Sequence, residues 1–233
     1  MSFLQNFISL TAAGIMMVSA GLKDAAPQQD VDGLLFLVNR HWTISENYTP
    51  KVVDSGVPGQ VRSMRADAGA ALKEMFAACK QEAGITLLSV SGYRSYGKQA
   101  NIYRRKLRRV KGNEAKAQEY VAPPGASEHQ LGLAMDIGQK NKSTLTYSFG
   151  DTKGGKWARE NCWRFGFILR YDAEWEEITG YKYEPWHFRY VGKENARLIH
   201  EANIPFETWL ADYRTKLLIE LMSEPSTEKR VNP

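Results

Sequence analysis

The sequence has little cysteine: only Cys79 and Cys162 occur in its 233 residues. Neither lies in a CxxC pair or other cysteine-rich spacing, which excludes the usual cysteine-based zinc sites. Cys79 continues an apolar stripe at helical spacing, and Cys162 lies in a second amphipathic stretch. Burial as two free thiols is therefore the favoured interpretation. A disulfide between them stays an alternative if the protein is exported.

Long apolar runs are also missing. The apolar segment at residues 7–20 is too short and too interrupted for a transmembrane helix. It is similar to the apolar core of a signal peptide, but no basic residue precedes it, since the first is Lys23. We interpret residues 1–33 as a degraded or truncated export segment followed by a linker. We therefore predict an extracytoplasmic location, secreted or associated with the cell envelope, and leave open whether the segment is cleaved.

Several catalytic motifs are absent as well. Without GxGxxG or GxxxxGK[ST], nucleotide-loop chemistry has no support. The HExxH pattern of helical zinc proteases and the GxSxG pattern of serine hydrolases do not occur either. Neither cysteine has a neighbourhood typical of a catalytic thiol.

The formal net charge is +5, and its densest basic run is "YRRKLRRVKG" at residues 103–112. Apolar residues at helical spacing within this run favour a helix with a solvated basic face. No nucleic-acid-binding motif accompanies the charge, so we predict no nucleic-acid partner. An anionic cell-wall polymer fits the charge equally well, which suggests peripheral association with the anionic cell envelope.

The hydrophobic pattern predicts an α+β fold with a small antiparallel sheet flanked by helices. Apolar spacing indicates a helix over residues 61–83 that ends at Gly84, and Ser95 is placed to cap the helix that carries the basic run. Short apolar runs predict four strands, at residues 85–92, 131–138, 167–171 and 186–192. Two further helices are expected before a polar tail that begins near residue 224.

The stretch "SEHQLGLAMDIG" at residues 127–138 places two metal-binding side chains in an otherwise apolar run. On a strand, Asp136 shares its face with small residues only, which leaves room for an ion or a substrate. His129 lies an odd number of residues away and would face the other side. The preceding loop must therefore turn His129 round if the two side chains are to meet. Taken alone, Asp136 can also be read as a buried structural carboxylate.

A second cluster, "YEPWHFRYVG", contributes Glu184 and His187. Two imidazoles and one carboxylate from separate segments suit Zn²⁺ and leave a fourth position open for water. A carboxylate that is not a ligand can then accept the proton of that water. Pro185 interrupts the strand between Glu184 and His187, so that both side chains can face one centre. The other histidines, His41 and His200, are interpreted as ordinary surface or helix residues.

Three segments together resemble the VanY-type D-alanyl-D-alanine carboxypeptidases: "SGYRSYGKQ", "SEHQLGLAMDIG" and "GYKYEPWHFRYVG". These zinc peptidases share a fold with D-Ala-D-Ala dipeptidases and the Hedgehog signalling domain. The resemblance covers about residues 34–210 and leaves 211–233 as a helix end and polar tail. It implies seven site residues: His129, Asp136 and His187 as Zn²⁺ ligands, Glu184 as general base, Arg94 at the oxyanion, and Ser127 and Gln99 at the substrate carboxylate.

By this resemblance we expect a monomeric zinc D,D-carboxypeptidase that removes the terminal D-alanine of peptidoglycan stem peptides. An L,D-carboxypeptidase or a cell-wall endopeptidase on the same scaffold is the enzymatic alternative. A non-catalytic zinc-bearing wall-binding module is the alternative from another class, and Glu184 and Arg94 argue against it. The sequence leaves open whether the activity serves wall maturation or glycopeptide resistance.

Overall fold

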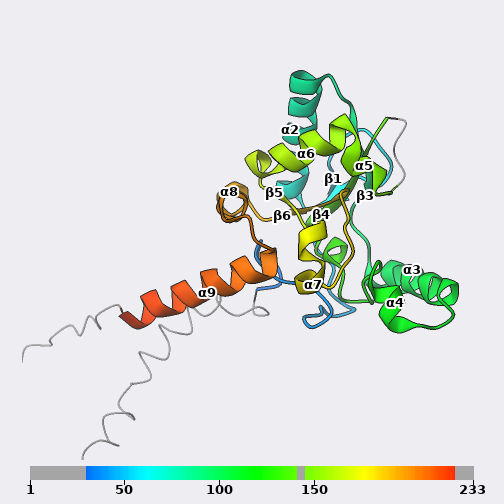
Figure 1. Cartoon of the computed structure of the whole chain (residues 1–233), viewed down its shortest axis with the longest axis vertical. Coiled ribbons are helices and arrows are strands. Elements are labelled where there is room, and N and C mark those ends of the chain that lie inside the picture. Colours follow the sequence, from blue (N-terminus) through cyan, green and yellow to red (C-terminus); the bar gives the residue numbers. More distant parts are fainter. Residues whose placement is uncertain (1–29, 141–144, 224–233) are drawn as a thin grey trace, which may run out of the picture.

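The computed structural model describes residues 30–140 and 145–223 (Figure 1). The apolar segment at residues 7–20 and the polar tail after residue 223 lie outside these ranges, so the expected export and location stay predictions. Helices surround small antiparallel sheets, which confirms the predicted α+β class. Within the described part of the chain, no helix has both the length and the apolar character needed to span a membrane.

A four-stranded antiparallel sheet lies at the centre of the molecule, in the order β3-β4-β6-β5. Its strands are β3 (Leu87–Ser91), β4 (Ala134–Gln139), β5 (Phe167–Leu169) and β6 (His187–Tyr190). Each overlaps a predicted strand, although β4 begins at Ala134 rather than at residue 131 and ends at Gln139 rather than at residue 138. The residues just before it form a 3₁₀ turn, η1 (Glu128–Leu131), that ends at Gly132 in the left-handed conformation.

The first long helix, α2 (Ala66–Ala83), ends at Gly84 as predicted. Its predicted start at residue 61 is wrong, because β2 (Ser63–Met64) pairs there with β1 (Val53–Asp54). The Ser63 carbonyl also accepts a hydrogen bond from the Tyr93 amide, and the Arg65 amide donates to the Gly132 carbonyl. These long-range backbone bonds replace the helical ones and hold the start of α2 against the turn before β4.

The helix with the basic run and the two C-terminal helices occur in the predicted order, and shorter helices lie between them (Figure 1). Ser95 caps α3 (Tyr96–Arg109), which carries the basic run, and α4 (Glu114–Gln118) packs beside it. The others described are α5 (Ser148–Asp151), α6 (Lys153–Asn161), η2 (Cys162–Phe165), η3 (Ala173–Trp175), α7 (Glu176–Thr179), α8 (Lys193–Ala202) and α9 (Phe206–Ser223). Helices α3 and α4 lie at one end of the molecule, whereas α2 and α6 cover the opposite end.

The main core packs side chains of β4 and β6 against α2. Met135 and Ile137 are fully buried there together with Leu72, Met75 and Phe188. Strand β4 is buried on both faces, so the face that carries Asp136 is enclosed by protein and not exposed to solvent. Both cysteines are buried free thiols, which confirms the favoured interpretation of the sequence.

Gly132 is the residue whose conformation fixes the turn before β4. Its φ of +69° is unfavourable for other residues, and an added Cβ would lie 3.0 Å from the Val52 Cγ1 atom. We expect Gly132→Ala to lower the free energy of unfolding by at least about 1–2 kcal/mol. Gly84→Ala is the matched control, because Gly84 has a φ of +72° but open space around a Cβ. Denaturant unfolding that shows equal losses for both variants would contradict a special role for the Gly132 contacts.

Candidate metal centre

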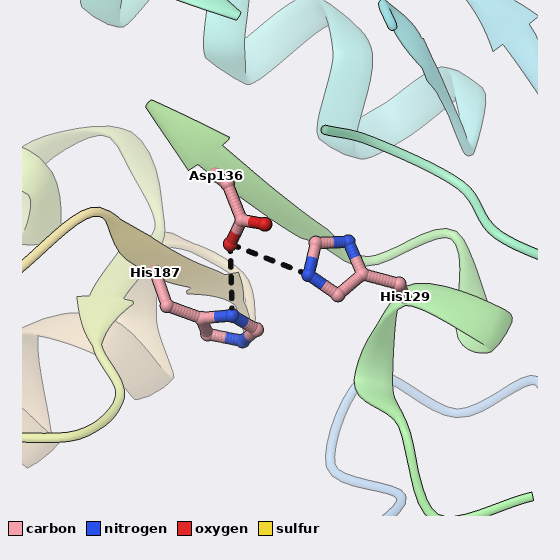
Figure 2. A group of neighbouring side chains, drawn as sticks. All are labelled: His129, Asp136 and His187. Carbon is pink, nitrogen blue, oxygen red and sulfur yellow. Dashed lines mark hydrogen bonds and ion pairs between the residues drawn. The ribbon is translucent and has the colours of Figure 1, made fainter. Parts of the chain in front are cut away.

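Three side chains from separate elements converge on one point beneath the sheet surface. His129 comes from η1, Asp136 from β4 and His187 from β6, and Figure 2 shows all three pointing toward one another. One donor atom from each lies within 4.8 Å of the other two. Asp136 Oδ1 is 3.3 Å from His129 Nε2 and 3.1 Å from His187 Nδ1. The predicted ligand set is thus assembled in space.

The η1 turn explains how the side chain of His129 comes to face Asp136. A regular strand from residue 129 would direct this side chain away from Asp136. Instead, the 3₁₀ turn and the left-handed Gly132 reverse the chain before β4 begins. His129 Nδ1 lies 2.8 Å from the Gly92 carbonyl oxygen. Because a carbonyl only accepts hydrogen bonds, Nδ1 carries the proton and the lone pair of Nε2 faces Asp136.

His187 is oriented by strand pairing and by a buried carboxylate. It is the direct partner of Asp136 in the antiparallel register of β4 and β6, so both side chains leave the sheet on the same face. Its Nε2 atom lies 3.2 Å from Glu128 Oε2, which can only accept. With Nε2 donating to Glu128, Nδ1 is the nitrogen that faces Asp136, and after loss of its proton it would present a lone pair to a metal ion. A carboxylate or carbonyl behind each ligating histidine is typical of metal sites.

An unpartnered atom shows that these residues fit a metal ion. His129 Nε2 is buried and has no hydrogen-bond partner among the described residues. A buried polar atom without a partner is unfavourable, and metal coordination would satisfy it. Two imidazoles and a carboxylate in a tetrahedral set with one open position suit Zn²⁺.

The charges of the site shift the pKa values of its ligands in opposite directions. Burial lowers the pKa of His129 to about 4, and the nearby Arg94 adds to the effect. Burial also disfavours charge on His187, but the hydrogen bonds to Asp136 and Glu128 outweigh it and raise the pKa to about 9. Burial alone would raise the pKa of Asp136, and the two histidines instead hold it well below its usual range. At neutral pH, Asp136 is therefore ionised, His129 is neutral and His187 carries a proton.

Glu184 lies beside the ligands without joining the cluster of three. Its Oε2 atom is 3.8 Å from His187 Nδ1. The His187 amide donates to the Glu184 carbonyl, so a tight turn through Pro185 brings both side chains to the same side. Burial raises the pKa of Glu184 to about 8, and the negative charge of Asp136 contributes. A mostly buried carboxylate with a raised pKa at this position is a candidate proton acceptor.

All seven residues predicted for the site line one cavity of about 240 Å³. Arg94 reaches it from the loop after β3, and its buried Nε atom has no protein partner within the described residues. Burial lowers the pKa of Arg94, while the carboxylates of Asp136 and Glu184 favour its charge. The guanidinium therefore brings positive charge and an unused donor to the cavity.

Ser127 and Gln99 also line the cavity, with different freedom to bind a ligand. Ser127 is buried and its side chain makes no capping hydrogen bond in η1. Gln99 is also buried, with 1% exposure. Its Nε2 atom donates to the Ala122 carbonyl, and its buried Oε1 atom has no partner among the described residues. In this orientation Gln99 offers an acceptor, so its contact with a substrate carboxylate stays a prediction.

The sequence did not reveal the buried ion pairs behind the ligands. Glu128 is 1% exposed and accepts hydrogen bonds from Arg170 Nε at 2.9 Å and Arg189 Nη1 at 3.0 Å. Arg170 also makes two hydrogen bonds to Glu207 at the start of α9. Burial would raise the pKa of Glu128, but the two arginines hold it well below its usual range. Glu128 therefore stays ionised and can orient His187.

Comparison with known proteins gives one consistent family. The VanY family model, described as D-alanyl-D-alanine carboxypeptidase, matches residues 61–193. The chain is 44% identical to the putative carboxypeptidase YodJ of Bacillus subtilis, over 78% of this chain and 68% of that protein. It is 40% identical to a D-alanyl-D-alanine carboxypeptidase of Enterococcus faecium, over 53% of this chain but only 35% of that one.

Solved structures agree with this result. The chain is 43% identical to the LdcB LD-carboxypeptidase, with a TM-score of 0.72, covering 78% of this chain and 87% of that one. It is 34% identical to the vancomycin-resistance D,D-pentapeptidase VanY in complex with Zn(II), with a TM-score of 0.65, over 76% and 98% of the two chains. These similarities confirm the predicted fold.

Removal of one ligand should remove the metal. We expect the parent protein to bind about one equivalent of zinc, and His187→Ala to lose most of it, because two protein ligands rarely hold Zn²⁺ tightly. Zinc content after dialysis against a weak chelator is the measurement. His41→Ala is the control, since His41 is exposed and lies outside the ligand cluster. Undiminished zinc in His187→Ala would overturn the ligand assignment.

Glu128→Gln should destabilise the fold strongly, because it leaves Arg170 and Arg189 with less compensating charge. We expect a loss of about 3–5 kcal/mol in unfolding free energy at pH 7. The depressed pKa of Glu128 stabilises the fold above about pH 4.3, the ordinary value of Glu, so the difference between variant and parent should shrink as the pH falls below it. Denaturant titration at several pH values measures the loss of stability at pH 7 and its change with pH.

Glu82→Gln is the matched control for this prediction. It removes a carboxylate that pairs with Arg164 at the surface. Water screens an exposed pair, which then contributes little to stability, so this variant should unfold almost like the parent protein. Equal losses in the two variants would mean that the buried pairs around Glu128 contribute no more than a surface pair.

Proposed function

The chain belongs to the VanY D-alanyl-D-alanine carboxypeptidase family, and we propose that it is a zinc-dependent enzyme that removes the terminal D-alanine from peptidoglycan stem peptides. The observation that carries this proposal is the convergence of His129, Asp136 and His187 within 4.8 Å, with Glu184 and Arg94 lining the same cavity. A metal site, a proton acceptor and a cation in one cavity are the parts that hydrolysis of a peptide bond requires.

Glu184 has the position and the chemistry of the general base. When bound, zinc supplies Lewis-acid chemistry that lowers the pKa of a coordinated water to about 7 and polarises a carbonyl group. Glu184 takes the proton from the attacking water and later delivers it to the amine of the leaving D-alanine. Its low exposure keeps competing water away from the carboxylate, and the turn at Pro185 holds it beside His187.

Arg94 stabilises the negative charge that develops on the carbonyl oxygen of the substrate. Its Nε donor has no partner within the described protein, so a substrate oxygen can use it without breaking an existing bond. The hydrogen bond from the Arg94 amide to the His129 carbonyl holds its backbone next to the metal ligands. Donors of this kind typically contribute about 10²–10³ in turnover.

The shape of the cavity supports action at the end of a peptide. At about 240 Å³, it is smaller than the roughly 300–1,000 Å³ typical of sites for drug-sized ligands. A terminal D-alanine fits such a space, whereas a chain continuing on both sides of the scissile bond needs an open groove. Ser127 lies in the same cavity with its hydroxyl free of capping bonds, as a residue that binds a terminal carboxylate requires.

L,D-carboxypeptidase activity is the second candidate, favoured by the similarity to the LdcB LD-carboxypeptidase. The two activities differ in the configuration of the residue before the scissile bond. In both activities the metal site, Glu184 and Arg94 would have the same roles in hydrolysis. The difference therefore depends on the part of the cavity that holds the penultimate residue of the substrate.

Two stem peptides separate these candidates. One ends in D-Ala-D-Ala and the other in an L-configured residue followed by D-alanine, and D-alanine release is measured from each with and without chelator. A D,D-enzyme should cleave the first at least tenfold faster, and chelator should abolish the reaction. Preference for the second peptide would establish the L,D-activity instead. Cleavage that resists exhaustive chelation would contradict the zinc mechanism.

Glu184→Gln tests the assigned base. The amide is close in size to the carboxylate, so fold and zinc content should survive, but it cannot accept the proton. We expect turnover to fall by about 10²–10⁴, measured as D-alanine release alongside zinc content. The control is Glu174→Gln, an exposed glutamate outside the cavity. Turnover within a few-fold of the parent would refute the base assignment, and loss of zinc would identify Glu184 as a ligand.

A further inference from the structure

The outward face of α3 carries a cluster of cations that the catalytic site does not use. We define the basic face of α3 as Lys98, Arg104, Arg105 and Arg108, which line one shallow hollow together with Asn101. All five residues are exposed. We propose that this face binds an anionic phosphodiester polymer of the cell wall and so holds the enzyme beside its substrate. The inference rests on the proposed function, because it takes the wall as the place of action.

Positive charge is concentrated in this one segment. Residues 98–111 contain seven Lys and Arg and no Asp or Glu. The whole chain has a net charge of +5, so the rest of the chain carries −2. A general surplus of positive charge therefore does not explain the cluster. Charge segregated in this way attracts polyanions at long range and raises their rate of association.

The cations of α3 also lack the carboxylate partners that arginines elsewhere have. Among the residues the structure describes, seven arginines outside α3 lie within 4.0 Å of a carboxylate: Arg62, Arg65, Arg159, Arg164, Arg170, Arg189 and Arg197. No such pair involves an arginine or lysine of α3 in that part of the chain. The donors of the basic face are thus available to an anion from outside.

The helix macrodipole explains only part of this arrangement. Cations are favoured in the last turn of a helix, which accounts for Lys106, Arg108 and Arg109. Lys98 lies in the first turn of α3, where the same dipole disfavours a positive charge. Arg104 lies in the middle of the helix, beyond the reach of that effect. Local helix stability therefore does not account for the full length of the basic face.

The basic face lies on the same helix as part of the catalytic cavity. Gln99 and Ile102, on the other side of α3, line that cavity. A helix is about 10 Å across, so a polymer on the outer side would lie within about that distance of the catalytic site. Helix α3 stands at one end of the molecule in Figure 1, where a long polymer can approach without meeting α2 or α6.

Wall polymer fits this face better than nucleic acid or a membrane. Proteins that bind single-stranded nucleic acid stack bases on aromatic side chains, and the five residues of the hollow include none. A helix that binds a membrane presents apolar residues to the lipid, whereas buried Tyr103 faces into the protein here. A surface of cations and one amide recognises a flexible chain of phosphodiesters by charge alone.

The test measures binding of fluorescent poly(glycerol phosphate) to the full chain by anisotropy, at several salt concentrations. The variant K98Q/R104Q/R105Q/R108Q removes four charges of the basic face. The matched control K51Q/K73Q/K153Q/K156Q removes four charges from exposed lysines outside α3. We expect at least tenfold weaker binding for the variant and less than threefold for the control. With four contacts, a rise from about 50 to about 200 mM salt should weaken binding by the parent roughly fiftyfold.

Release of D-alanine from a soluble stem peptide separates this inference from the proposed function. It should be the same for parent, variant and control, because none of the changed residues lines the cavity. Absence of polymer binding by the parent, or equal binding by variant and control, would overturn the inference. So would equally tight binding of a single-stranded oligonucleotide at the same salt. Polymer binding without peptide cleavage would support the inference and contradict the proposed function.

Discussion

The register between β4 and β6 is the constraint on which the site depends. In this register Asp136 is the direct partner of His187, so the two side chains emerge side by side from one face of the sheet. A slip of one residue would turn one of them to the opposite face. The apolar residues on either side, Met135 and Phe188, are fully buried and prevent that slip. The packing of the core thus sets the position of two of the three ligands.

Buried charge extends this constraint to the C-terminal part of the fold. His187 needs an acceptor behind it, and Glu128 provides one from a position with 1% exposure. An ionised carboxylate so deeply buried requires compensation, which Arg170, directly after β5, and Arg189 of β6 supply. Arg170 in turn pairs with Glu207. One orientation at the metal site therefore accounts for a chain of ion pairs that reaches the start of α9.

Local patterns in the sequence predicted much of the fold and the ligand positions, and long-range pairing explains what they missed. Apolar runs located the four strands, and Ser95 and Gly84 marked helix ends, because these signals act within a few residues. The burial of Glu128 was missed because its arginine partners lie 42 and 61 residues further along the chain. Periodicity does not distinguish a glutamate exposed beside a ligand from one buried behind it. The start of α2 was misplaced for the same reason, because the backbone before Ala66 forms hydrogen bonds with β1, Tyr93 and Gly132 instead of helical ones.

Electrostatics and geometry lead to the same description of the site. Asp136 and Glu128 both stay ionised, and His187, whose pKa is raised to about 9, lies between these two carboxylates, while Arg170 and Arg189 also pair with Glu128. A divalent cation held by Asp136 and the two histidines would replace the proton of His187 and bring one more unit of charge. The same cation would favour the ionised form of Glu184, whose pKa burial raises to about 8. In the proposed enzyme, metal binding and the protonation state of Glu184 would therefore be coupled, because the charge that neutralises the ligands would also keep Glu184 ionised and able to accept a proton.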